Sequence, residues 1–218
     1  MKHNLKFQKL YNDANSKKQM IKHFSFDHGQ YYHYRYHLAN LNALNNGFSS
    51  LKDYLENIHK SCPNEYFKSG PRSSQLKFNL NIEKIEVKGH ELSQMTKKVI
   101  ELNGKSHTNV QVFLLNNDKK TIAVEIPIWL ENNEMREFNF KEKKPLTGHI
   151  DIIRKENDNI WVWDYKPNAE KQKYAPTQLY FYAAMLSKRT NIPLKEFRCG
   201  YFDENIAYMF KPENGRLH

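Results

Sequence analysis

The spacing of apolar and polar positions divides the chain into a polar N-terminal part and a strand-rich C-terminal part. The first 70 residues have a mostly helical pattern. The clearest helix is predicted at 49–62, with apolar residues at helical spacing and Pro63 just beyond its end. The stretch SGPRSS at 69–74 has the composition of a linker. The pattern predicts a mostly helical N-terminal extension of unknown role over residues 1–85 and a core domain over residues 86–218.

From residue 75 onwards, predicted strands and helices alternate. Strands are predicted at 75–89, 110–115, 121–130, 146–155, 160–166, 197–202 and 206–210, and helices at 92–102 and 176–191. The turn-forming sequence ENDN joins the strands at 146–155 and 160–166, and DEN joins the last two. This order predicts an α/β fold with a central mixed sheet flanked by helices.

Composition narrows the class of protein. No segment approaches the ~18 consecutive apolar residues that a membrane helix needs, and the first residues lack the apolar run of a signal peptide. We therefore expect a soluble, cytoplasmic protein that does not bind membranes. Cys62 and Cys199 are the only cysteines, which argues against a cysteine-bound zinc ion, an iron–sulfur cluster or a disulfide scaffold.

The chain is basic, with a formal net charge of +10. Lysine and arginine displace counterions from phosphates, so the charge favours a nucleic-acid partner. A composition biased towards lysine and asparagine explains it equally well. The stretch YYHYRYH at 31–37 combines aromatic rings with arginine and histidine. Such a surface can stack bases and hold phosphates, but the same pattern fits a half-buried amphipathic element.

Two aspartates are expected to face each other across the ENDN hairpin. A turn centred between Asn157 and Asp158 places Glu156 opposite Asn159 and, five pairs further along, Asp151 opposite Asp164. Their Cβ atoms would lie ~5 Å apart. Lys166 shares a face with Asp164, because alternate residues of a strand point the same way.

Two carboxylates this close repel each other by about 3 kcal/mol at an effective dielectric constant near 20. A protein keeps such a pair when a cation lies between them or when one is protonated. Mg²⁺ and Mn²⁺ suit paired oxygen ligands, and Lys166 would then stand beside the metal. A cross-strand ion pair between Lys166 and Asp151 or Asp164 explains the same residues. The spacing does not decide between the two.

The motifs GHID at 148–151, DYK at 164–166 and QLYFY at 178–182 stand in the order G-x-x-D, D-x-K, Q-x-x-x-Y. This order resembles the PD-(D/E)XK nuclease superfamily, most closely its RecB-like branch, over roughly residues 120–212. The resemblance implies a restriction-endonuclease-like core. The cysteine count excludes the relatives that carry a four-cysteine iron–sulfur cluster.

The resemblance implies roles for individual residues. Asp151 and Asp164 would bind the metal together with the backbone carbonyl of Tyr165, and Lys166 would be the catalytic lysine. Gln178 and Tyr182, which lie four apart on one helical face, would shape the site and contact DNA. Without the resemblance, these two residues are more simply a polar rim on a packed helix.

Two further residues are candidates. Glu125 lies among apolar neighbours in the strand at 121–130, where it either joins the metal site or pairs with a cation across the sheet. RecB-like nucleases commonly place a histidine ligand on the helix before these strands, and His90, near the start of the predicted helix, is the candidate for it.

Two functions compete. The first is Mg²⁺- or Mn²⁺-dependent hydrolysis of DNA phosphodiester bonds, by an exonuclease or an endonuclease in DNA repair, recombination or processing. The second is an inactive nuclease fold that only binds nucleic acid, single- or double-stranded. Intact motifs favour the first, and the sequence gives no indication of the oligomeric state.

Overall fold

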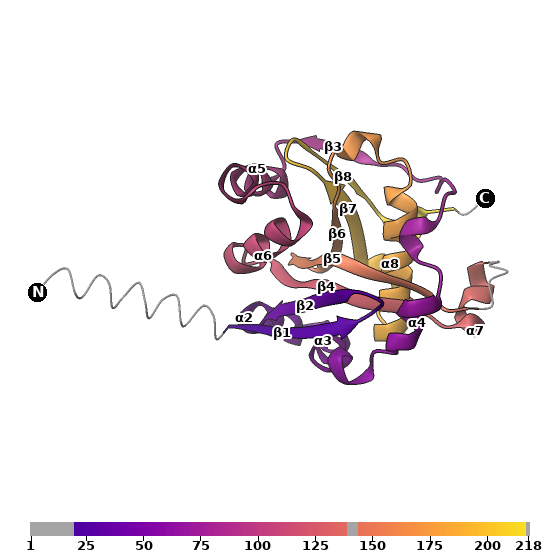
Figure 1. Cartoon of the computed structure of the whole chain (residues 1–218). Helices are drawn as coiled ribbons and strands as arrows, with labels where there is room; N and C mark the ends of the chain where they lie inside the picture. Colours follow the sequence, from indigo (N-terminus) through magenta and orange to yellow (C-terminus); the bar gives the residue numbers. More distant parts are fainter. Residues whose placement is uncertain (1–19, 139–143, 217–218) are drawn as a thin grey trace, which may run out of the picture.

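The computed structural model describes residues 20–138 and 144–216 (Figure 1). The strands are β1 (Ile21–Asp27), β2 (Tyr31–His37), β3 (Ile85–Lys88), β4 (Thr121–Leu130), β5 (Leu146–Glu156), β6 (Asn159–Tyr165), β7 (Phe197–Phe202) and β8 (Ile206–Phe210). The α-helices are α2 (Leu38–Leu41), α3 (Ser49–Ser61), α4 (Asn64–Ser69), α5 (Glu91–Asn103), α6 (His107–Asn117), α7 (Asn132–Met135) and α8 (Ala175–Thr190).

All eight strands form one mixed sheet, in the order β1-β2-β4-β5-β6-β7-β8-β3. Only β6 and β7 are parallel among the paired strands of the described chain, and α8 connects them as the crossover helix. A mixed sheet flanked by helices confirms the predicted α/β fold and is consistent with a restriction-endonuclease-like core. The pattern located β4, β5, β6, β7, β8, α5 and α8 to within a few residues, because each is a long uninterrupted apolar pattern.

Helices cover both faces of the sheet (Figure 1). We call the cluster between the sheet, α3 and α8 the α8-side core; it includes Leu55, Ile150, Ile153, Leu179 and Met185. We call the cluster between the sheet, α5 and α6 the α6-side core; it includes Leu92, Val110, Leu114, Ile152 and Trp163. The middle strands of the sheet are therefore buried on both faces. This packing fixes the positions of the residues on these strands.

Three predictions of local structure are wrong. Residues 21–37 of the predicted helical extension form the hairpin β1–β2, which pairs with β4. Helices do follow it, α3 among them, whereas residues 1–19 lie outside the described residues. Residues 110–115 belong to α6, because Val110 and Leu114, one helical turn apart, are both buried. In 75–89 only β3 is a strand, because β8 pairs with residues 85–88 alone.

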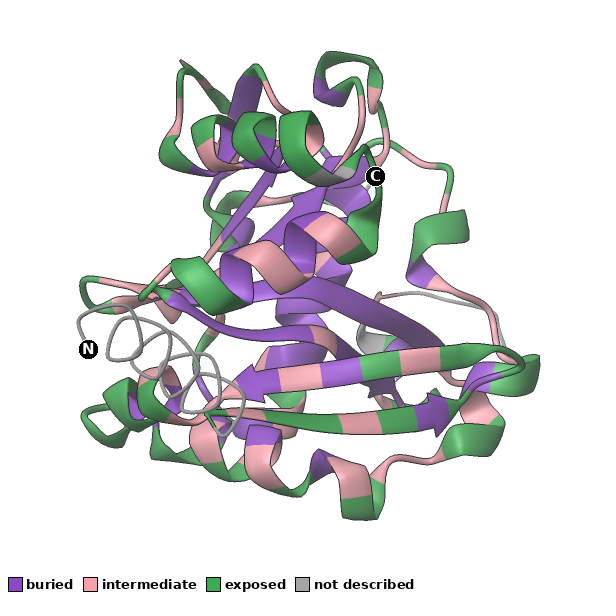
Figure 2. Cartoon of the chain, turned by 60° about the vertical axis from the view of Figure 1, so that its left-hand side comes forward, coloured by how far each residue is buried: buried purple, intermediate pink, exposed green. Residues whose placement is uncertain are grey.

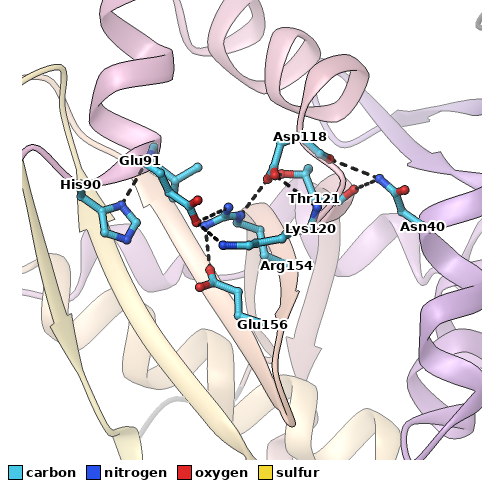
Figure 3. A network of polar contacts seen from close by, with 9 residues as sticks. Asn40, His90, Glu91, Asp118, Lys120, Thr121, Arg154 and Glu156 are labelled. Carbon is cyan, nitrogen blue, oxygen red and sulfur yellow. Dashed lines mark hydrogen bonds and ion pairs between the residues drawn. The ribbon is translucent and has the colours of Figure 1, made fainter.

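A buried arginine joins the two helices of the α6 side to the central hairpin (Figure 3). The Arg154 guanidinium, on β5, has no exposed surface and contacts three carboxylates. Its nitrogens lie 2.8 Å from Asp118 Oδ2, 2.7 Å from Glu91 Oε1 and 2.6 Å from Glu156 Oε1. Asp118 follows α6 and Glu91 begins α5, so one side chain fixes both helices to the sheet.

We expect Arg154→Ala to lower the free energy of unfolding by about 3–5 kcal/mol, because it removes a fully buried cation and leaves the largely shielded carboxylates of Asp118 and Glu156 without it. Urea denaturation of the whole chain measures the change. Lys119→Ala removes a neighbouring exposed cation and should change stability by less than about 0.5 kcal/mol. Equal effects of the two variants would contradict the structural role of Arg154.

Candidate active site

The pairing of β5 with β6 brings the two aspartates together. Glu156 faces Asn159 and Ile152 faces Trp163, which is the register expected from the ENDN turn. Asp151 and Asp164 come next on their strands after the pair Ile152 and Trp163, and their carboxyl groups interact. Asp151 Oδ2 also accepts a hydrogen bond from the backbone N–H of Tyr165 at 3.1 Å. Both aspartates are buried, so the hairpin holds two carboxyl groups next to each other away from bulk water.

β4 and β5 change their buried face at the acidic residues. On β5, Ile150 and Ile153 both pack into the α8-side core although they are three residues apart, while Ile152 packs into the α6-side core. Regular alternation would put residues 150 and 152 on one face. On β4 the same step occurs at Glu125, which has a φ of 55°. The register of its neighbours places Glu125 opposite Asp151, so both acids lie where the strands bend.

The two aspartates differ in pKa: that of Asp164 is raised and that of Asp151 is lowered. Burial and the charge of Asp151 raise the pKa of Asp164 to about 7, although Lys166 opposes this. Burial also acts to raise the pKa of Asp151, but a hydrogen bond from His107 and the charge of Lys166 lower it overall. The pair therefore holds one proton more readily than two isolated aspartates would.

Glu125 adds a third acid to the site. Burial, followed by the charge of Asp151, raises its pKa to about 7. Its Oε1 accepts a hydrogen bond from Gln111 Nε2 at 2.7 Å. The prediction that Glu125 lies near the two aspartates agrees with this position, while its role in metal binding stays a prediction.

Lys166 is the ammonium group of the site. Its Nζ lies 2.7 Å from Asp164 Oδ2. The sequence spacing allowed an ion pair across two strands, but this ion pair is local: it joins Asp164 of β6 to Lys166, the residue that follows β6. Burial acts to lower the pKa of Lys166, but the two aspartates outweigh it and raise the pKa. Lys166 is therefore a cation that can donate hydrogen bonds rather than a neutral base.

The sequence interpretation missed two residues of α6. His107 Nδ1 lies 3.5 Å from Asp151 Oδ2, and that contact raises the pKa of His107. Gln111, one turn later, holds Glu125. One helical face thus contacts two acids on neighbouring strands. The available signal was Ser106, whose side chain caps the helix by accepting the N–H of Asn109; reading 110–115 as a strand concealed it.

The contacts of His90 are with Leu92 and Trp163 rather than with the aspartates, so they do not support its predicted role as a metal ligand. His90 precedes α5, and its Nδ1 accepts the N–H of Leu92 at 3.3 Å. Its ring centroid lies 5.0 Å from that of Trp163, a residue of the α6-side core, and Figure 3 shows His90 beside Glu91. His90 therefore caps a helix next to the Arg154 cluster.

Gly148 and Tyr182 form a single packing contact between β5 and α8. A Cβ atom on Gly148 would lie 2.4 Å from Tyr182 Cε1 and 2.7 Å from Ser73 Oγ, so only glycine leaves room for the tyrosine ring. Gln178 Nε2 donates to the Tyr182 hydroxyl at 2.7 Å. Gln178 and Tyr182 are both buried, which favours a supporting role over the predicted contact with DNA.

The donor set fits a hard divalent cation in part. Across the residues that the structure describes, no three His, Cys, Asp or Glu side chains are already arranged to hold a metal. Asp164 Oδ2 is buried without a hydrogen bond of good geometry, although Lys166 Nζ is close to it. Three acids face one lysine and one histidine here. Oxygen atoms with this excess of negative charge suit Mg²⁺ or Mn²⁺, whose remaining ligands are usually waters and phosphate oxygens.

The raised pKa of Asp164 predicts a pH dependence of stability without metal. Between about pH 4 and pH 7 the folded chain keeps a proton that the unfolded chain has released, so stability falls as pH rises through this range. We expect wild type to lose on the order of 2–4 kcal/mol relative to Asp164→Asn. Urea denaturation in EDTA at several pH values measures this.

Asp158→Asn, at the exposed turn of the same hairpin, is the matched control and should keep the wild-type pH dependence. If Asp164→Asn also follows the wild-type curve, Asp164 is ionised throughout and the shared-proton description is wrong.

Comparison with known proteins agrees with this geometry. A sequence model of the PD-(D/E)XK nuclease superfamily matches residues 72–213, which include all three motifs and α6. A search of curated proteins finds no match. In the described part of the chain, no helix is both long enough and apolar enough to cross a bilayer.

Proposed function

The chain belongs to the PD-(D/E)XK nuclease superfamily, and we propose that it is a divalent-metal-dependent nuclease that hydrolyses DNA phosphodiester bonds. The main support is the convergence of Asp151, Asp164 and Lys166 at one buried point of the sheet. With both aspartates ionised the net charge of the three groups is negative, which a divalent cation would offset, and the bound cation would in turn attract an anionic substrate.

Each residue would have a distinct task. Asp151 and Asp164, together with the backbone carbonyl of Tyr165, would hold Mg²⁺ or Mn²⁺. The ion would supply Lewis-acid stabilisation of the phosphate and make an attacking water more acidic. Lys166, held as a cation, would orient that water or donate to a phosphate oxygen as negative charge develops. Glu125 would add to the negative charge that attracts the metal.

His107 supports assignment to the RecB-like branch. The resemblance calls for a histidine on the helix before the catalytic strands, and α6 supplies one within 3.5 Å of Asp151. We therefore propose His107, in place of His90, as the histidine of the metal site. A role in DNA repair, recombination or processing follows from the same branch.

Incubation of the purified chain with Mn²⁺ or Mg²⁺ and labelled single- or double-stranded DNA tests the proposal. We expect metal-dependent cleavage, lowered at least 100-fold by Asp164→Ala or Lys166→Ala because each removes charge at the reacting phosphate. Asp158→Asn should cleave at the wild-type rate. Binding of DNA without any cleavage by wild type would favour the non-cleaving module instead.

A matched histidine pair tests the metal site separately. His107→Ala should lower cleavage about 10–100-fold and require more Mn²⁺ for half-maximal rate. His90→Ala should leave the rate unchanged and cost only about 1 kcal/mol of stability through loss of its cap. The Mn²⁺ dependence of initial rates measures the first effect, and urea denaturation the second. The reverse ranking of the two variants would restore His90.

A further inference from the structure

The hairpin β1–β2 lies outside the residues matched by the nuclease family and adds two strands to the sheet beside β4. Arg35 of β2 pairs with Val124, the residue before Glu125. The β1–β2 hairpin therefore lies beside the part of β4 that carries Glu125. At the strand spacing of ~4.8 Å, Arg35 lies about two strands, or roughly 10 Å, from Asp151.

One face of the hairpin is buried and the other is open. Phe26, Tyr34 and Tyr36 pack into the α8-side core. Alternate residues therefore point away from it: His23 and Ser25 on β1, and Tyr31, His33 and Arg35 on β2. Figure 2 shows buried positions along β2 separated by a less buried one. The open face carries an aromatic ring that is 75% exposed, Tyr31, a large apolar surface in contact with water.

The polar groups of this face are held in place by one another. His33 Nδ1 lies 3.1 Å from Ser25 Oγ and 3.2 Å from His23 Nε2. Arg35 Nη1 donates to the backbone carbonyl of His33 at 3.1 Å. Alternate side chains of β2 are thus fixed in a row, ~6.6 Å apart, from the hairpin turn towards Glu125.

Arg35 has no counter-ion in the described residues: its charge is balanced only at a distance by Glu125. The side chain is half-buried, and burial outweighs Glu125 and lowers the pKa of the guanidinium. A partly desolvated cation without an ion pair is unfavourable until an anion reaches it. A phosphate is an anion that the planar guanidinium binds through two parallel hydrogen bonds.

We propose that the open face of the β1–β2 hairpin binds an unpaired segment of the nucleic-acid substrate, with a phosphate on Arg35 and a base stacked on Tyr31. This rests on the proposed function and adds the substrate form to it. An unpaired segment is favoured over a duplex because stacking on Tyr31 needs a free base face. The segment would lead along β2 into the acidic site.

Binding without cleavage tests the proposal. The full chain is titrated in EDTA into a fluorescent single-stranded oligonucleotide and, separately, into the same sequence as a blunt duplex, with anisotropy as the readout. We expect tighter binding to the single strand. Tyr31→Ala should weaken single-strand binding about 5–150-fold, the usual effect of losing one stacking contact, and leave duplex binding unchanged.

The salt dependence isolates the phosphate contact. For single strands, each neutralised phosphate contributes about 0.7 to the slope of log K against log salt. Arg35→Ala should reduce the slope by about that amount, and Arg35→Lys should keep it. Lys22→Ala is the control. Lys22 precedes His23 on β1, so its side chain points to the opposite face of the hairpin, and its removal should leave the slope unchanged. If Arg35→Ala does not fold, Arg35→Gln, which also removes the charge but keeps a polar side chain, should show the same reduction in slope.

The outcomes separate the two proposals. If wild type cleaves DNA but Arg35 and Tyr31 variants bind like wild type, the hairpin surface is wrong and the nuclease function stands. If those variants lose binding while wild type never cleaves, the hairpin surface stands and the nuclease function fails. Equal affinity of wild type for single strand and duplex, with no effect of Tyr31→Ala, overturns the unpaired substrate.

Discussion

The antiparallel register of β5 and β6 is the constraint on which the site depends. A slip of one residue would turn the side chain of either aspartate to the other face of the sheet. The turn at Asn157 and Asp158 sets this register, and the Arg154 cluster fixes β5 to α5 and to the residue that follows α6. The chain thus fixes the position of two mutually repelling carboxyl groups by contacts that lie away from them.

Several elements stabilise the close approach of the three acids. α6 contributes His107 to Asp151 and Gln111 to Glu125, while Lys166 extends from the end of β6 to Asp164. These contacts offset only part of the negative charge, since the pKa values of Asp164 and Glu125 remain raised. The remaining excess of negative charge supports the proposed divalent cation.

Sequence predicted those parts of the fold that local patterns determine. The strands β4 to β6 and helix α8 follow from apolar periodicity, and the register of β5 with β6 follows from one turn. The pattern of 110–115, with Val110, Val112 and Leu114 alternating, imitates a strand, and only packing against the sheet shows that it is a helix. His107 was missed for that reason.

Long-range neighbours lay beyond any local pattern. Arg35 and Glu125 are ninety positions apart, and their proximity depends on β2 pairing with β4. The hairpin itself shows alternation at Phe24, Phe26, Tyr34 and Tyr36, but a polar composition concealed it. Residues that act through tertiary pairing are therefore the ones that sequence reasoning finds last.

The contact between Gly148 and Tyr182 has a consequence for how this protein can change over generations. The ring occupies the space that any side chain at 148 would need, so the two positions are not free to drift independently. A larger residue at 148 becomes tolerable only after the tyrosine has been replaced by something smaller, and that replacement would also remove the partner of Gln178. Substitutions in the two motifs, which lie thirty residues apart, are therefore coupled through this contact.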